Sequence, residues 1–164
     1  MEDPVQEITT PIRLDYRYTA GSATAKFLRG LKQGRLLGQR CPKCAKVIVP
    51  ARGACARCGV ATEEEVEVAD RGTVTTFCVV HIPVPGSEIK PPFVCATIQL
   101  DGADIGCFHL VSEVSPDEVR AGMRVQAVWK PREEWDHTFE NIRYFKPTGE
   151  PDADLEDTRG TGHA

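Results

Sequence analysis

The spacing of apolar residues changes along the chain, from irregular to helical and then to that of strands. Residues 1–21 have no sustained periodicity and are predicted to form an extended arm. Within 22–34, apolar residues recur at helical spacing, at Ala23, Phe27 and Leu31. We expect a short helix over 23–33, with Ser22 as its N-cap and Gly34 as its stop.

Alternating apolar and polar positions begin near Val66 and predict five strands. The predicted strands are 73–80, 93–100, 103–110, 124–130 and 139–146. Asp101-Gly102 predicts a tight hairpin between the second and third strands, because this dipeptide tolerates the positive φ angles of a type I′ turn. Ser115-Pro116 predicts a short helical turn between the third and fourth. This order matches an OB-fold barrel, and a generic five-stranded sandwich is the alternative.

The chain is therefore predicted to be mainly β, in five successive parts. These are an arm at 1–21, a helix at 22–34, a ribbon at 35–62, an OB-fold at 63–147 and an acidic tail at 148–164. The tail is rich in Gly, Pro, Asp and Thr and poor in apolar side chains, so we expect it to be disordered.

Four of the seven cysteines form two C-x-x-C pairs with ten residues between them. They are Cys41, Cys44, Cys55 and Cys58. This spacing, with an odd cysteine count, indicates metal binding in a reducing compartment rather than a disulfide framework. Two such knuckles on a β-ribbon suit the tetrahedral preference of zinc, and four thiolates leave no position for water. The pattern predicts one structural zinc ion, with an iron centre or a metal-free site as alternatives.

The composition of the chain fits a globular protein without a membrane span. Its 164 residues are 41% hydrophobic, and no apolar run approaches the about 20 residues that a membrane span needs. The acidic N-terminus lacks the basic and apolar segments of a secretory signal. We therefore expect a cytoplasmic location and no membrane partner.

Charge is distributed unevenly behind a net value of −4. Residues 16–62 contain ten Lys or Arg and no Asp or Glu, whereas 63–147 contain fifteen acids and eight bases. Cations near a zinc ion with four thiolates offset its negative charge, which explains part of the basic excess. The rest indicates a surface for the phosphates of coenzyme A or of nucleic acid. From charge alone, the residues predicted to contact coenzyme A are Arg35, Arg40, Lys43, Lys46, Arg52 and Arg57.

The remaining cysteines lie in predicted strands and are interpreted as core thiols; they are Cys78, Cys95 and Cys107. His109 follows Cys107 by two residues on one face of a strand, so a stand-alone enzyme that uses this pair stays open as a hypothesis. Trp129 is predicted to be core, and Trp135 to be an exposed contact residue. We assign no catalytic residue from the sequence.

Several motifs, in this order along about residues 22–147, resemble the zinc-ribbon OB-fold acyl-CoA-associated family, formerly a domain of unknown function. Besides the four cysteines, they are the run 34–41 (GRLLGQRC), Pro50 and Arg52, Gly72-Thr73-Val74, Gly122-Met123-Arg124-Val125 and Phe145-Lys146-Pro147. The chain departs from the family at Ala51, where a second Pro is common, and at Asp70, where a second Gly is common. Neither position is a zinc ligand.

The resemblance implies a rubredoxin-like ribbon and a non-catalytic subunit that binds and stabilises a thiolase-superfamily enzyme acting on acyl-CoA thioesters. The chain is most similar to subunits that accompany lipid-transfer-protein-type thiolases in steroid side-chain degradation. There the pair is expected to act as a retro-aldolase that releases propionyl-CoA and a ketosteroid. The alternative function is a single-stranded nucleic-acid-binding module, against which the acidic barrel argues.

Overall fold

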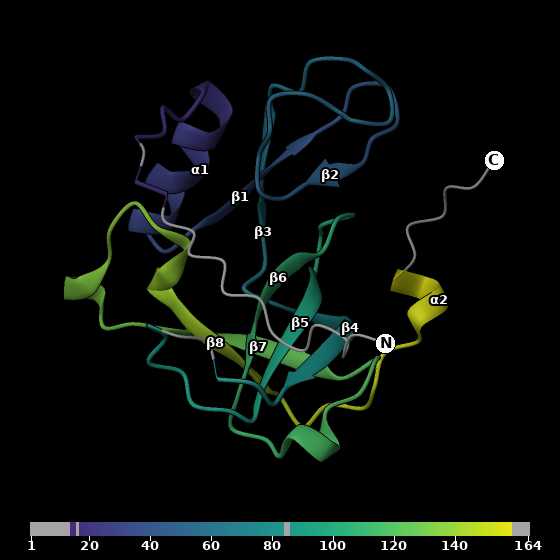
Figure 1. Cartoon of the computed structure of the whole chain (residues 1–164). Helices are drawn as coiled ribbons and strands as arrows, with labels where there is room; N and C mark the ends of the chain where they lie inside the picture. The colour runs from purple at the N-terminus through teal and green to yellow at the C-terminus, as the bar shows by residue number, and fades with distance from the viewer. Residues whose placement is uncertain (1–13, 16, 84–85, 159–164) are drawn as a thin grey trace, which may run out of the picture.

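The computed structural model describes residues 14–15, 17–83 and 86–158, which form two β units preceded by a helix (Figure 1). The first elements are α1 (Ser22–Lys32), β1 (Leu36–Arg40), β2 (Val47–Ile48) and β3 (Glu64–Val68). The longer strands follow as β4 (Arg71–Val80), β5 (Phe93–Leu100), β6 (Cys107–Val111), β7 (Arg124–Trp129) and β8 (Ile142–Pro147). Short helical elements are η1 (Pro116–Glu118), η2 (Arg132–Glu134), η3 (Phe139–Asn141) and α2 (Leu155–Thr158).

Five strands close into a barrel in the order β4-β5-β6-β8-β7. Neighbouring strands are antiparallel, except that β6 runs parallel to β8, with Val111 opposite Phe145. This closure confirms the predicted OB-fold and excludes the sandwich. Side chains that alternate inward fill the barrel, and those of Val74, Ile98 and Phe145 have no exposed surface.

A separate three-stranded sheet, ordered β2-β1-β3, forms the ribbon. β3 falls within the stretch assigned from sequence to the OB-fold, but it pairs with β1 from Leu36 opposite Val68 to Arg40 opposite Glu64. This pairing brings the acidic strand beside the basic stretch, and three ion pairs follow. They are Lys26–Glu65 (2.7 Å), Arg35–Glu67 (2.8 Å) and Arg40–Glu64 (3.1 Å).

Helix α1 packs between the ribbon and the η3 turn. The rings of Phe27 and Phe139 lie 6.1 Å apart, and the buried Asn141 donates from Nδ2 to the carbonyl of Leu31 (3.1 Å). The predicted Ser22 cap is wrong: Ser22 is the first helical residue, and Gly21 precedes it without a side-chain cap. No helix in the described ranges combines the length and apolarity needed to cross a membrane.

The connection between β5 and β6 is longer than the predicted two-residue hairpin. β6 begins at Cys107 rather than at residue 103. Asp104 explains this difference, because its backbone N–H donates to Val47 (2.9 Å) and its carboxylate accepts from the N–H of Val47 (2.8 Å). The loop is therefore bonded to the ribbon instead of extending β6.

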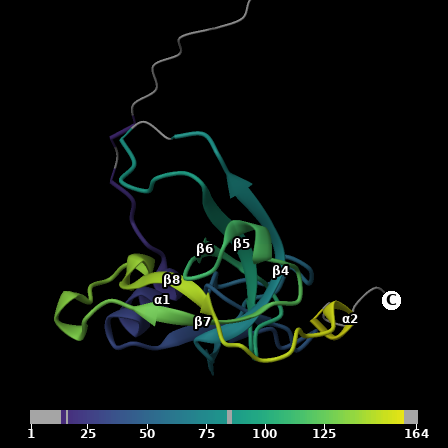
Figure 2. The same cartoon turned by 90° about the horizontal axis from the view of Figure 1, so that it is seen from below.

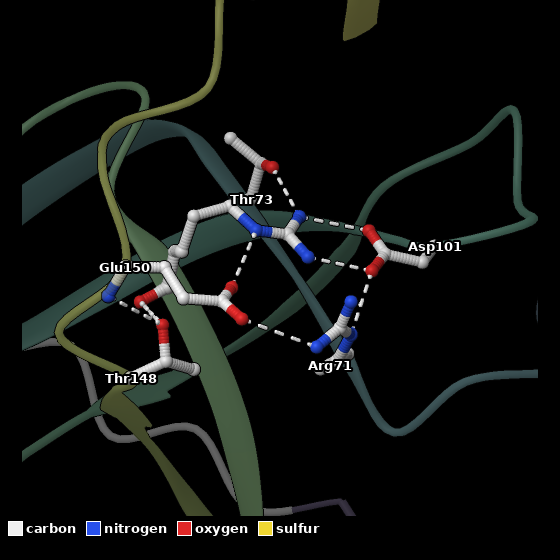
Figure 3. Close-up of polar contacts among 6 residues, drawn as sticks. Arg71, Thr73, Asp101, Thr148 and Glu150 are labelled. Atoms are coloured by element: carbon white, nitrogen blue, oxygen red, sulfur yellow. Dashed lines mark hydrogen bonds and ion pairs between the residues drawn. The ribbon is translucent and has the colours of Figure 1, made fainter.

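The expected disorder of the acidic tail is wrong for residues 148–158, and 159–164 lie outside the described residues. Glu150 pairs with Arg71 (3.3 Å) and Arg124 (3.5 Å), two arginines at the start of β4 and β7. Arg124 also makes a bidentate pair with Asp101 (2.6 and 2.8 Å), within the cluster shown in Figure 3. Composition alone missed this segment, because its acids have partners on the barrel.

Candidate metal centre

The four cysteines converge at the end of the ribbon sheet. Their sulfur atoms all lie within 4.8 Å of one another, and Cys44 Sγ is 3.8 Å from Cys55 Sγ. A zinc ion with four bonds of about 2.3 Å in a tetrahedron separates its sulfurs by about 3.8 Å. The cluster therefore fits one structural zinc ion, as the spacing predicted.

The two C-x-x-C segments fold alike. Ala45 donates its N–H to Cys41 O and Gly59 donates to Cys55 O, both at 2.9 Å. Ala45 and Gly59 occupy the same position after each knuckle, and both have positive φ, +59° and +66°. A left-handed backbone at this position turns the chain so that both sulfurs of a knuckle face the same point.

The thiols differ in their readiness to ionise. Backbone N–H groups of Cys44 and Lys43 point at Cys41 Sγ and lower its pKa to about 6. Burial and the neighbouring thiols raise the pKa of Cys58 to about 12. A divalent cation offsets the cost of gathering four thiolates, so metal binding and local folding are coupled.

Apolar side chains cover the cysteine cluster from both β units. Ile48 is buried with Cys41 and Cys55, and Ile105 from the β5–β6 loop packs against them. Ile105 directly follows Asp104, which bonds Val47. Neither loop residue was predicted, because their contacts in the ribbon are distant in sequence, with 57 positions between Asp104 and Val47, and leave no local periodicity.

A buried glutamine holds the second knuckle to β1. Gln39 is 3% exposed, and its Oε1 accepts from Gly53 N (2.9 Å) and Thr62 Oγ1 (3.0 Å). These bonds satisfy polar groups on both sides of the second C-x-x-C segment. The ligand-bearing loop is thus fixed to the sheet at its start and its end.

The basic residues predicted to contact coenzyme A do not form one free surface. Arg35 and Arg40 are ion-paired with glutamates of β3, and Arg40 also donates to Ala45 O (3.2 Å). The others lie on or between the knuckles; they are Lys43, Lys46, Arg52 and Arg57. Contact with coenzyme A stays a prediction.

The three remaining cysteines have different environments. Cys107 is buried, which raises its pKa to about 11, and Cys95 is half-buried with a raised pKa for the same reason. Cys78 is exposed, so its assignment to the core is wrong. A register shift between Val74 and Thr76 reverses the alternation of β4 and turns Cys78 outward.

His109 packs as an aromatic residue. Its ring lies 5.1 Å from that of Phe139 and 5.5 Å from that of Phe145, and burial lowers its pKa. Its Nδ1 accepts from the N–H of Leu110 (2.9 Å). Cys107 is held in its neutral form by burial, so the geometry gives the Cys107–His109 pair no activated nucleophile.

The side chains of both tryptophans are half-buried and pack against each other. Their rings lie 5.3 Å apart, and Trp135 Nε1 donates to Lys130 O (2.8 Å). Trp135 is half-buried against Gly34, so the prediction of an exposed contact residue is wrong. Trp129 is half-buried rather than fully core, and its Nε1 donates to Asp70 (3.0 Å).

A four-cysteine ribbon joined to a closed five-stranded barrel defines the class of zinc-ribbon OB-fold proteins. Comparison with family models matches residues 29–64 to the ChsH2 rubredoxin-like zinc ribbon domain and 65–130 to the ChsH2 C-terminal OB-fold domain. A DUF35 domain-containing scaffold protein of Methanocaldococcus jannaschii is 36% identical over 116 residues, 68% of this chain and 81% of that protein. The chain belongs to the DUF35 family, which confirms the resemblance seen in the sequence.

Two further similarities come from larger proteins or assemblies. A probable enoyl-CoA hydratase alpha subunit of Thermomonospora curvata is 32% identical over 64% of this chain, but the match spans only 32% of that protein. A solved structure described as an Ltp2-ChsH2(DUF35) aldolase has a chain that is 27% identical, with a TM-score of 0.59. The alignment covers 80% of this chain and 98% of that chain.

Proposed function

We propose that this protein is the zinc-containing, non-catalytic subunit of a complex with a thiolase-superfamily enzyme that acts on acyl-CoA thioesters. The observation that carries the proposal is its likeness to a chain of the Ltp2-ChsH2(DUF35) aldolase, which it matches over 98% of that chain. A closed four-thiolate site gives zinc a structural role, so the chemistry belongs to the partner. The cytoplasm, where thiols stay reduced, is the proposed location.

The finer proposal is a retro-aldol cleavage of a steroid β-hydroxyacyl-CoA. The bond between the α and β carbons breaks, the hydroxyl proton leaves to a base, and the β carbon becomes the carbonyl of a ketosteroid. The α carbon keeps the electron pair as an enolate, which is protonated to give propionyl-CoA. This chain would stabilise the partner and help to position the thioester.

Direct contact with coenzyme A is proposed for the bases near the knuckles. Arg35 and Arg40 are engaged with β3, so Lys43 and Arg52, both exposed, are the first to test. The same ion pairs leave less positive surface for nucleic acid than the sequence suggested. This favours the subunit proposal over the nucleic-acid alternative.

Co-expression with a thiolase-superfamily protein of the lipid-transfer-protein type tests the subunit role. The expected result is a complex that stays together through size-exclusion chromatography, with one zinc per copy of this chain. The proposal would be contradicted if the chain elutes alone even when both proteins are present well above the dissociation constants of typical protein complexes. Titration with single-stranded DNA at low salt is the control for the alternative, because low salt favours such contacts.

A further inference from the structure

Exposed apolar side chains are concentrated on the β4–β5 hairpin and on the neighbouring strand β6. In the described part of the chain, four of the six exposed large apolar side chains lie on β4, β6 and the β4–β5 connection. They are Phe77, Ile82, Ile89 and Phe108, and the other two are Leu14 and Tyr18. Figure 2 shows the β4–β5 hairpin extending beyond the body of the barrel. Apolar residues gathered in this way on a protein surface mark an interaction site more often than isolated ones do.

The strand register explains how apolar side chains come together on the outer face of β4, β5 and β6. Cys78 pairs with Cys95 and Val80 with Phe93, and on the next strand Cys95 pairs with Leu110. Side chains of paired residues stand on the same face of a sheet, so these five form one outward cluster. A sheet face exposed to water normally carries polar residues at these positions. We call this cluster, with Phe108, the apolar face.

A hollow of about 330 Å³ lies within the apolar face. Phe93, Cys95, Phe108 and Leu110 line it, together with Phe139 from η3. Its size is at the small end of the range of about 300–1,000 Å³ for pockets that hold small molecules. A large side chain from another protein fits such a hollow better than an acyl-CoA does.

Other sides of the molecule are already covered by the chain itself. The tail bonds to the starts of β4 and β7, and α1 covers the end of the barrel at η3. The charges of β1 are paired with those of β3. The apolar face has no such cover among the described residues, since Phe108 is 66% exposed and Cys78 is exposed as well.

We propose that the apolar face is the surface that docks the thiolase-like subunit, and that one aromatic or large aliphatic side chain of that subunit occupies the hollow. This inference rests on the proposed function, since the matched ChsH2 chain comes from an aldolase assembly and is spanned almost entirely. Interfaces of this kind concentrate their binding energy on a few central apolar residues. Phe108 and the hollow beside it form that centre.

Cys78 provides a built-in probe of this surface. Among the seven cysteines it is the exposed one, because four belong to the metal site, Cys107 is buried and Cys95 is half-buried. The zinc-loaded chain is treated with iodoacetamide, alone and in complex, and alkylation is quantified by peptide mass spectrometry. Docking should slow alkylation of Cys78 about tenfold or more, because an interface centre excludes water.

A matched control thiol can be introduced by substitution elsewhere on the barrel. Gln126 is exposed on β7, where it pairs with Lys146 of β8 and Arg71 of β4. The Gln126→Cys thiol should be alkylated at the same rate in the free chain and in the complex. Protection of both thiols would indicate general burial and would overturn the assignment.

Substitution supplies an independent readout. Phe108→Asp should weaken the complex about thirtyfold or more, as expected for a central residue of an interface. Gln126→Asp, which adds the same charge on β7, should leave the affinity unchanged. Because Phe108 is largely exposed, Phe108→Asp should unfold at the same urea concentration as the parent chain.

The outcomes separate this inference from the proposed function. A complex that forms with full affinity in Phe108→Asp, and in which Cys78 stays reactive, overturns the inference while the subunit role stands. Absence of any complex with the parent chain overturns both. Protection of Cys78 in the chain alone at high concentration assigns the face to a second copy. Protection by acyl-CoA alone assigns the hollow to the thioester, and either result overturns the inference.

Discussion

Asp104 in the β5–β6 loop and Val47 in the ribbon exchange two hydrogen bonds that join the barrel to the metal module. The backbone N–H of Asp104 donates to Val47 O (2.9 Å), and the Asp104 carboxylate accepts from Val47 N–H (2.8 Å). The next residue, Ile105, packs on the cysteine cluster. Stability of the zinc site and position of the barrel are therefore connected through one loop.

Asp104→Ala should weaken this connection. It removes the acceptor of the Val47 N–H, and loss of a partner for such a group costs about 1–3 kcal/mol. Urea unfolding of the zinc-loaded protein measures the change, and transfer of zinc to a chelator should become faster. Asp104→Asn keeps a carbonyl oxygen for the same bond and should lie between the two. Equal stability of all three proteins would contradict the role assigned to Asp104.

Features that depend on residues close together in the sequence could be predicted, whereas features that depend on contacts between distant residues could not. The C-x-x-C spacing places ligands within a few residues, so the zinc site was predictable from Cys41, Cys44, Cys55 and Cys58 alone. The five barrel strands were also predictable, because alternation is a local signal. The outward turn of Cys78 was not, because it depends on a register shift against β5.

Long-range pairing accounts for the other errors. Glu64 pairs with Arg40 across neighbouring strands, which turns an apparent charge asymmetry into local neutrality. Glu150 pairs with Arg71 and Arg124 and orders a segment that composition marks as disordered. None of these contacts has a signature in the sequence on either side of the residues involved.

Replacement of a zinc ligand should abolish metal binding. Cys55→Ser should lower the zinc content from one per chain to near zero, because a closed thiolate site loses its geometry with one ligand. Amide exchange in the ribbon should become fast, since the metal supplies folding free energy there. Cys78→Ser, which changes a thiol away from the cluster, should keep one zinc per chain. Full zinc content in Cys55→Ser would contradict the assignment.

The left-handed positions after the two knuckles predict a loss of stability for Gly→Ala and no loss for Ala→Gly. Gly59→Ala should lower the free energy of unfolding by about 1 kcal/mol, because a Cβ is unfavourable at positive φ although space is available. Ala45→Gly should cause no loss, because it relieves that conflict at +59°. Chemical denaturation of the zinc-loaded variants gives both values. A stabilising Gly59→Ala would show that the knuckles are not equivalent.

Asn141 should be among the most sensitive polar positions. It is fully buried, donates to Leu31 O and Asp136 O, and accepts from Asp136 N (3.0 Å). Asn141→Ala should cost about 3 kcal/mol, because three backbone groups lose a partner, one of them buried and two part-buried. Gln126→Ala removes an exposed amide and should change stability little. Urea unfolding measures both changes. Similar unfolding midpoints for Asn141→Ala and Gln126→Ala would contradict the role of Asn141 in joining Leu31 to Asp136.

His109 should make stability depend on pH near neutrality. Burial holds its folded pKa below the ordinary value of about 6.5, so the unfolded chain binds the proton more readily. Its contribution is therefore present above about pH 6.5 and is lost as the pH falls through the folded pKa. His109→Phe should show a flatter stability profile between about pH 7 and 5 than the parent. Acid loss of zinc affects both proteins, so parallel profiles would contradict the prediction.

An acyl-CoA cleavage assay with purified components tests whether this chain is a required subunit of the enzyme. The thiolase-like protein is supplied with a steroid β-hydroxyacyl-CoA, with and without the zinc-loaded chain, and release of propionyl-CoA is measured by mass spectrometry. We expect the two proteins together to release propionyl-CoA and ketosteroid in equal amounts, while this chain alone releases neither. Cleavage by the thiolase-like protein at the same rate without this chain would contradict its role as a required subunit.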